Sequence, residues 1–98
     1  MTYSGGTLSA VEAAPFANVW RAIVVALDAE NITLLDRERI EGGGKIDGRT
    51  LDLQRVKVTV QTLTEQKTAL SIRVDSFGNS ELTHSIYKKF KIALGPTP

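Results

Sequence analysis

The sequence predicts one α+β domain in which two amphipathic helices cover one face of an antiparallel sheet. Two segments carry apolar residues at helical spacing, and two others alternate apolar and polar residues with the period of a strand. Each helix has one apolar stripe to bury, and the strands offer one apolar face. We therefore expect a single domain over residues 1–98, with an ordered core over about 3–94, built as a two-layer sandwich. Its sheet would have four to five strands, in the order β-α-β-β-β-β-α.

Composition and charge limit the classes of function. A chain of 98 residues, 42% of them apolar and 23% charged, is typical of one globular domain. The net charge of +1 predicts no nucleic-acid partner. The absence of cysteine excludes disulfides and thiolate metal sites. No apolar run approaches the roughly 18 residues of a membrane-spanning helix.

The N-terminal third predicts a strand and a helix. Residues 6–13 form a short strand-like segment whose alternation does not reveal the buried face. Pro15 is typical of the first position of a helix, where its missing N–H costs nothing. A helix is expected from Pro15 to about Glu30. Its apolar stripe consists of Phe16, Val19, Trp20, Ile23, Val24 and Leu27.

Acids and bases alternate in the next β-like segment, residues 32–40. Asp36, Glu38 and Glu41 could supply the carboxylates of a hydrolase, which needs two carboxyl groups held in a cleft. Because Arg37 and Arg39 lie between them, we interpret the segment as a charged strand face or edge. Such charges discourage aggregation between sheet edges.

Residues 42–44 are three consecutive glycines and predict a turn between strands. With Lys45 they resemble a phosphate-binding loop only superficially. Such a loop needs Ser or Thr after the lysine and then a helix, whereas Ile46 and a further extended segment follow here.

Two runs across a polar turn at residues 64–67 predict an antiparallel hairpin with one solvated face. Its apolar side consists of Val56, Val58, Val60, Leu70, Ile72 and Val74. Its polar side is the candidate interaction surface and consists of Lys57, Thr59, Gln61, Ser71 and Arg73. We expect Arg73 to pair with a neighbouring acid.

The segment after the hairpin predicts a tight corner and the second helix. Gly78 would supply a backbone conformation that a side chain obstructs, and Phe77 would close the edge of the core. Asn79 or Ser80 would cap the helix, which Gly95 ends. Its apolar stripe consists of Leu82, Ile86, Phe90 and Leu94.

The residues do not assemble a recognisable catalytic, metal or cofactor motif. His84 is the only histidine, and we interpret it as a solvated helix residue because no second imidazole or thiolate could complete a metal site. The serines have no activating base in an identifiable motif. We therefore predict a protein that is not an enzyme and needs no cofactor.

Three segments together resemble a small bacterial family, the domain of unknown function number 3568, described as envelope lipoproteins. These are the opening Tyr3-x-x-Gly6-x-Leu8, the pair Ala14-Pro15 before Val19-Trp20, and residues 71–79. The last segment is similar to the pattern I-R-V-G-x-F-G-D. This chain departs from it with Asp75 for the glycine and Asn79 for the acid.

The resemblance implies a periplasmic or membrane-tethered protein. Its membrane contact would be a lipid anchor on a cysteine upstream of Met1, outside these residues, and the family offers no catalytic residues to transfer. We expect a non-enzymatic binding or interaction module for an unknown protein or envelope component. One alternative is a small-molecule-binding or enzymatic domain with a pocket between helices and sheet. The other is a structural homodimer that pairs sheet edges.

Overall fold

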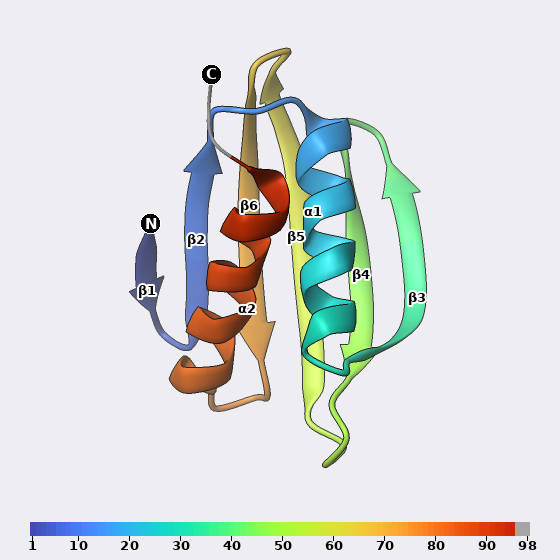
Figure 1. Cartoon of the computed structure of the whole chain (residues 1–98), viewed down its shortest axis with the longest axis vertical. Helices are drawn as coiled ribbons and strands as arrows, with labels where there is room; N and C mark the ends of the chain where they lie inside the picture. The colour runs from blue at the N-terminus through green and yellow to red at the C-terminus, as the bar shows by residue number, and fades with distance from the viewer. Residues whose placement is uncertain (96–98) are drawn as a thin grey trace.

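A single antiparallel sheet forms one layer of the protein and both helices form the other (Figure 1). The computed structural model describes residues 1–95. The strands are β1 (Thr2–Ser4), β2 (Thr7–Glu12), β3 (Thr33–Ile40), β4 (Gly43–Arg49), β5 (Arg55–Thr64) and β6 (Lys67–Val74), and the helices are α1 (Phe16–Ala29) and α2 (Ser80–Leu94). The order across the sheet is β1-β2-β6-β5-β4-β3.

The predicted α+β class is confirmed, but the strand count is wrong. The sheet has six strands instead of four to five, and the chain order begins β-β-α. The additional strand is β1, which pairs with β2 over only three residues. A segment this short carries no alternation that the sequence could reveal.

The core lies between the helices and the sheet. The predicted hairpin residues of β5 and β6 are buried there with Val19, Ile23 and Leu27 of α1 and with Ile86 and Phe90 of α2. On β2, the buried side chains are Leu8, Ala10 and Glu12. The polar Glu12 at a core-facing position explains why the alternation of this strand was unreadable.

Both ends of α1 differ slightly from the prediction. Pro15 precedes the helix as its N-cap, with extended backbone, and its carbonyl accepts hydrogen bonds from Asn18 and Val19. At the other end Asn31 has a φ of +59°. This left-handed residue lets the Ile32 N–H reach the Leu27 carbonyl at 3.0 Å and closes the helix.

Two of the three consecutive glycines belong to a strand rather than to a turn, which corrects the prediction. Gly43 and Gly44 begin β4, and the connection to β3 is Glu41-Gly42. A Cβ atom on Gly44 would lie 2.4 Å from Cζ3 of Trp20. The Trp20 ring therefore packs directly on the backbone of Gly44, in the space that a side chain would fill.

The corner before α2 is held by a glycine contact. Gly78 has a φ of +85°, and a Cβ atom there would lie 2.7 Å from Cα of Gly6, which confirms the expected steric requirement. Phe77 is 94% exposed, so its predicted role at the core edge is wrong. The chain packs against the β1–β2 turn through Gly78, and Phe77 lies outside this contact. Asn79 caps α2 by accepting from the Leu82 N–H.

Candidate functional site

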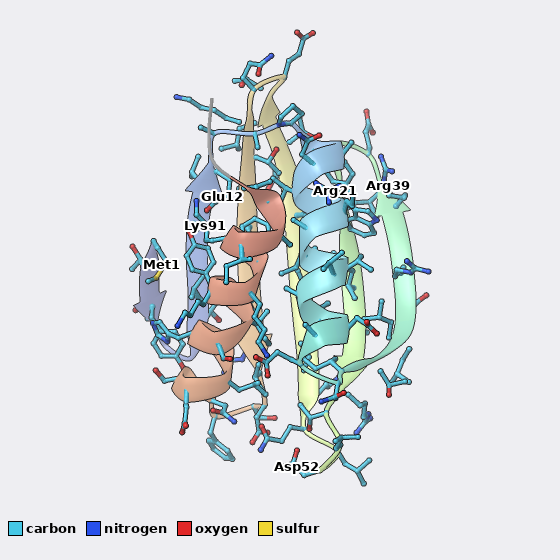
Figure 2. All side chains as sticks on the ribbon, in the orientation of Figure 1. Met1, Glu12, Arg21, Arg39, Asp52 and Lys91 are labelled. Atoms are coloured by element: carbon cyan, nitrogen blue, oxygen red, sulfur yellow. The ribbon has the colours of Figure 1, made fainter. Side chains whose placement is uncertain are left out.

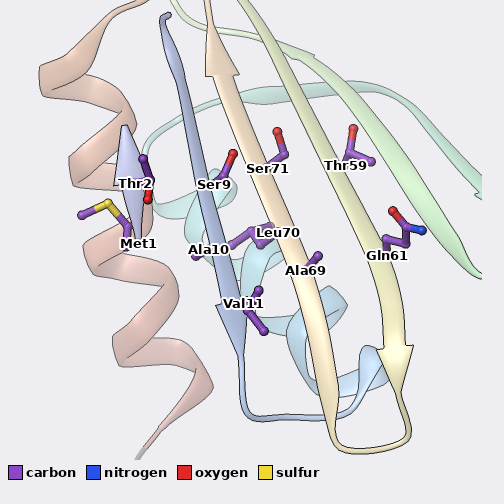
Figure 3. A pocket seen from close by; sticks show the side chains of 10 residues that line it. All are labelled: Met1, Thr2, Ser9, Ala10, Val11, Thr59, Gln61, Ala69, Leu70 and Ser71. Carbon is purple, nitrogen blue, oxygen red and sulfur yellow. The ribbon is translucent and has the colours of Figure 1, made fainter. Parts of the chain in front are cut away.

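The candidate site is the sheet face opposite the helices, which we call the open face. Figure 3 shows it with both helices behind the strands. Along β5, Lys57, Thr59 and Gln61 alternate with the buried valines and are exposed. Along β6, Ser71 and Arg73 alternate with buried residues and are half-buried. The five residues predicted as an interaction surface therefore lie on this one face.

The strand register places these residues in rows across the sheet. Thr59 lies opposite Ser71, and Ser71 lies opposite Ser9 of β2. The result is a row of three hydroxyl side chains on neighbouring strands, visible in Figure 3. In the adjacent row Lys57 lies opposite Arg73.

A shallow groove of about 480 Å³ crosses the open face. Its lining extends beyond the predicted surface to Thr2, Ser9, Val11 and Ala69 (Figure 3). Most of these side chains are small, so a bound group can come close to the sheet. The sequence missed the contribution of β1 and β2 because neither strand showed which of its faces was buried.

The predicted pairing of Arg73 with an acid is wrong. Its hydrogen-bond acceptors are two backbone carbonyls and one hydroxyl oxygen. Its Nη1 donates to the carbonyl of Gly5 at 2.7 Å and to Oγ1 of Thr7 at 3.0 Å. Its Nη2 donates to the carbonyl of Ser76. Arg73 thus ties the β1–β2 turn to the corner before α2, and Lys57 is the exposed cation of this pair.

Asp47 of β4 lies on the open face, one strand in from the β3 edge. Its register neighbours are Lys57 of β5 and Asp36 of β3. Among the described side chains, its Oδ1 atom is buried and accepts no hydrogen bond from the protein. A buried acceptor without a donor is costly, and because this oxygen is buried it is not accessible to a ligand on the open face.

On the helix side, Glu12 of β2 is paired with Tyr87 and Lys91 of α2. Glu12 is only 3% exposed and accepts from Oη of Tyr87 and from Nζ of Lys91, both at 2.7 Å. Figure 2 shows Glu12 and Lys91 side by side between β2 and α2. Burial and the adjacent Glu12 carboxylate raise the pKa of Tyr87 well above its ordinary value. This cluster joins strand to helix.

His84 is exposed on α2, with its ring 5.2 Å from that of Tyr3. Its Nδ1 lies 2.7 Å from the carbonyl of Ser80 in the preceding turn. Within residues 1–95, no group of three His, Cys, Asp or Glu side chains could hold a metal ion.

A second concave region, the α1–β3 groove, has a volume of about 700 Å³. It lies between the outer side of α1 and the edge strand β3. Its apolar lining comes from Val24, Val25, Leu34 and Leu51, and its polar lining includes Asp28 and Arg37. This groove is the place in the fold where the predicted alternative, a pocket between helices and sheet, would lie.

These features define a class: a two-layer α+β domain whose antiparallel sheet has both helices on one face and no helix on the other. The family described as "Protein of unknown function (DUF3568)" matches residues 1–92, and the chain belongs to this family. No curated protein matches the chain. Neither helix of the described residues is both long and apolar enough to cross a membrane.

Proposed function

We propose that this domain is a non-enzymatic binding module that contacts a protein or another envelope component through its open face. The observation that carries the proposal is the row of small hydroxyl side chains on β2, β6 and β5, which lines a groove on the face without helices. The envelope location, periplasmic or membrane-tethered, rests on the likeness to envelope lipoproteins described above.

The chemistry of the open face suits a partner that offers both hydrogen-bonding and apolar groups. Ser9, Ser71 and Thr59 both donate and accept hydrogen bonds and lose little side-chain freedom when they are covered. Lys57 adds an exposed cation. The single histidine of the chain, His84, lies against Tyr3 on the helix side of the sheet, away from these hydroxyls.

Site-specific photocrosslinking in the native bacterium tests this surface. A crosslinking amino acid at position 59 or 71 should yield the same envelope component, and Lys57→Glu should reduce that yield. The matched control places the crosslinker at Lys88, an exposed position on α2. A product from Lys88 and none from the open face would contradict the proposal.

Location is tested separately by fractionating the native cells and determining the N-terminus of the mature protein by mass spectrometry. A lipid-modified cysteine ahead of these residues, in the envelope fraction, is the expected result. An unmodified protein in the cytosol would refute envelope association without affecting the proposed surface.

The α1–β3 groove favours a second candidate function, binding of a small amphiphilic ligand between Val25 and Leu34 with Arg37 beside them. Titration with a fluorescent fatty acid tests this function. Saturable binding that Val25→Asp abolishes would support it, and binding that this variant leaves unchanged would exclude the groove.

A further inference from the structure

The strand β3 forms a long, free edge of the sheet. It lies last in the strand order and spans eight residues, whereas the opposite edge strand β1 spans three. Figure 1 shows β3 at the outer side of the sheet, beyond α1. One row of its backbone N–H and C=O groups thus has no strand partner among the described residues.

The charges of β3 are separated by face. Asp36 and Glu38 lie opposite Asp47 and Lys45, which are open-face residues of β4. Their acidic side chains therefore belong to the open face, and Glu38 lines a depression there with Lys57 and Thr59.

The two arginines of β3 belong to the helix side. Arg37 lies opposite the buried Ile46, and Arg39 lies opposite the buried Gly44. Arg37 lines the α1–β3 groove, and the guanidinium carbon of Arg39 lies 4.4 Å from the ring centre of Phe16 on α1. All acids of this edge are on one face and all bases are on the other.

This separation opposes pairing between two copies of the chain. Identical edges that pair about a two-fold axis run antiparallel and keep their open faces on the same side. Residues directly opposite each other share a face. In every register of such a pairing, an acid of one copy that lies opposite a charged residue of the other lies opposite an acid, and an arginine lies opposite an arginine. Pairs of like charge directly opposite each other are destabilising. A homodimer that pairs two β3 edges is therefore disfavoured.

We propose that β3 accepts a strand from a different protein, with Lys or Arg opposite Asp36 and Glu38 and with Glu or Asp opposite Arg37 and Arg39. Such a strand forms four cross-strand pairs of opposite charge in addition to the backbone ladder. This inference goes beyond the proposed function, because it concerns the edge of the sheet rather than its open face.

The surroundings of β3 also fit an added strand. The register shifts between Leu34 and Asp36, so the regular part of the ladder runs from Asp36 to Ile40 and suits a partner segment of similar length. On the helix side, Leu51 is 81% exposed and borders the α1–β3 groove with Val25. An apolar residue at the end of the added strand would cover this surface.

Two capped peptides of identical composition test the proposal. One alternates, Val-Glu-Lys-Glu-Lys-Val, and the other is blocked, Val-Glu-Glu-Lys-Lys-Val, so that each of its faces carries both signs. Titrations followed by amide NMR should show shifts centred on β3. The alternating peptide should bind about tenfold more tightly, owing to its larger number of favourable cross-strand pairs. Equal binding of the two peptides, or no shift in β3, would overturn the inference.

A double variant tests the self-repulsion. Arg37→Thr with Glu38→Thr leaves the net charge unchanged and removes the like-charge pairs from the registers that align the middle of β3. Sedimentation at matched concentration should show dimer for this variant and monomer for the wild type. A wild-type dimer with protected β3 amides would overturn the inference. Ser71→Glu changes the open face on β6, which β5 and β4 separate from β3, and should leave peptide binding by β3 unchanged, so the two proposals fail independently.

Discussion

The two edges of the sheet differ in how they end. The β1 edge is short and is tied to distant parts of the chain. Arg73 holds the β1–β2 turn, Gly78 packs on Gly6, and the Tyr3 ring lies against His84. The β3 edge is long and is held mainly by its ladder with β4 and by the contact of Arg39 with Phe16.

The fold therefore protects its two edges by different means. The β1 edge is closed by contacts between residues far apart in the sequence. The charge pattern of the β3 edge opposes pairing with a second β3. Substitutions at the first edge should therefore reduce the free energy of unfolding strongly. Substitutions at the second should change association more than stability.

The largest expected effect is at the closed edge. Gly78→Ala should lower the free energy of unfolding by about 3 kcal/mol, because it combines a left-handed backbone with a clash against Gly6. Gly42→Ala is the matched control near β3: its φ is +75°, but no atom lies within 4 Å of the added Cβ. It should cost about 1 kcal/mol. Equal losses in urea unfolding would show that crowding at Gly6 is unimportant.

The next effect concerns the cluster that joins β2 to α2. Glu12→Ala should cost about 2 kcal/mol, because it leaves Oη of Tyr87 and Nζ of Lys91 without their acceptor. Glu12→Gln keeps an acceptor and should cost less. If both variants unfold at the same urea concentration as the wild type, the cluster does not stabilise this edge.

The same cluster predicts a dependence on alkaline pH. The folded protein raises the pKa of Tyr87, so folding favours the neutral phenol. This stabilisation is fully present below the ordinary tyrosine pKa of about 10 and decreases as the pH rises above it. Thermal unfolding from pH 8 to 11 should show a steeper loss for the wild type than for Tyr87→Phe. Parallel curves would contradict the assignment.

A smaller effect is expected at the free edge. Arg39→Ala removes the cation from the Phe16 ring and should cost about 0.7 kcal/mol. Urea unfolding measures the loss, with Arg37→Ala as the control that has no such ring contact among the described residues. A loss as large as that of Gly78→Ala would mean that the two edges contribute equally to stability.

The smallest effect lies between the helices. Burial alone would raise the pKa of Glu30, but the hydrogen bonds from Lys89 and Ser85 and the charge of Lys89 outweigh it and lower the pKa. The carboxylate therefore stabilises the fold above its ordinary pKa, and this contribution is lost as the pH falls through the lowered value. Glu30→Gln should cost about 0.5 kcal/mol at neutral pH and flatten the loss of stability on acidification. If Glu30→Gln leaves the dependence of stability on acidic pH unchanged, this role of the Glu30 carboxylate is contradicted.

The sequence predicted the elements with strong periodicity and missed those fixed by distant contacts. The hairpin of β5 and β6 was readable because Val56 and Ile72 belong to regular alternations. The placement of Gly44 in a strand could not be read from the sequence, because it depends on contact with Trp20, which lies 24 positions earlier in the chain. The direction of Arg73 depends likewise on Gly5.

The candidate site was predictable in part for the same reason. Lys57, Thr59 and Gln61 follow from the pattern of one strand. Ser9 and Val11 joined the surface only when β2 paired with β6, because the buried Glu12 concealed which face of β2 points inward.

The position of Trp20 has a practical consequence. It is the only tryptophan of the chain, it rests on Gly44 of β4, and the guanidinium carbon of Arg39 lies 6.0 Å from its ring centre. Any strand that draws Arg39 toward a new carboxylate alters the surroundings of this indole. Its emission spectrum thus offers a label-free optical signal of what docks beside it.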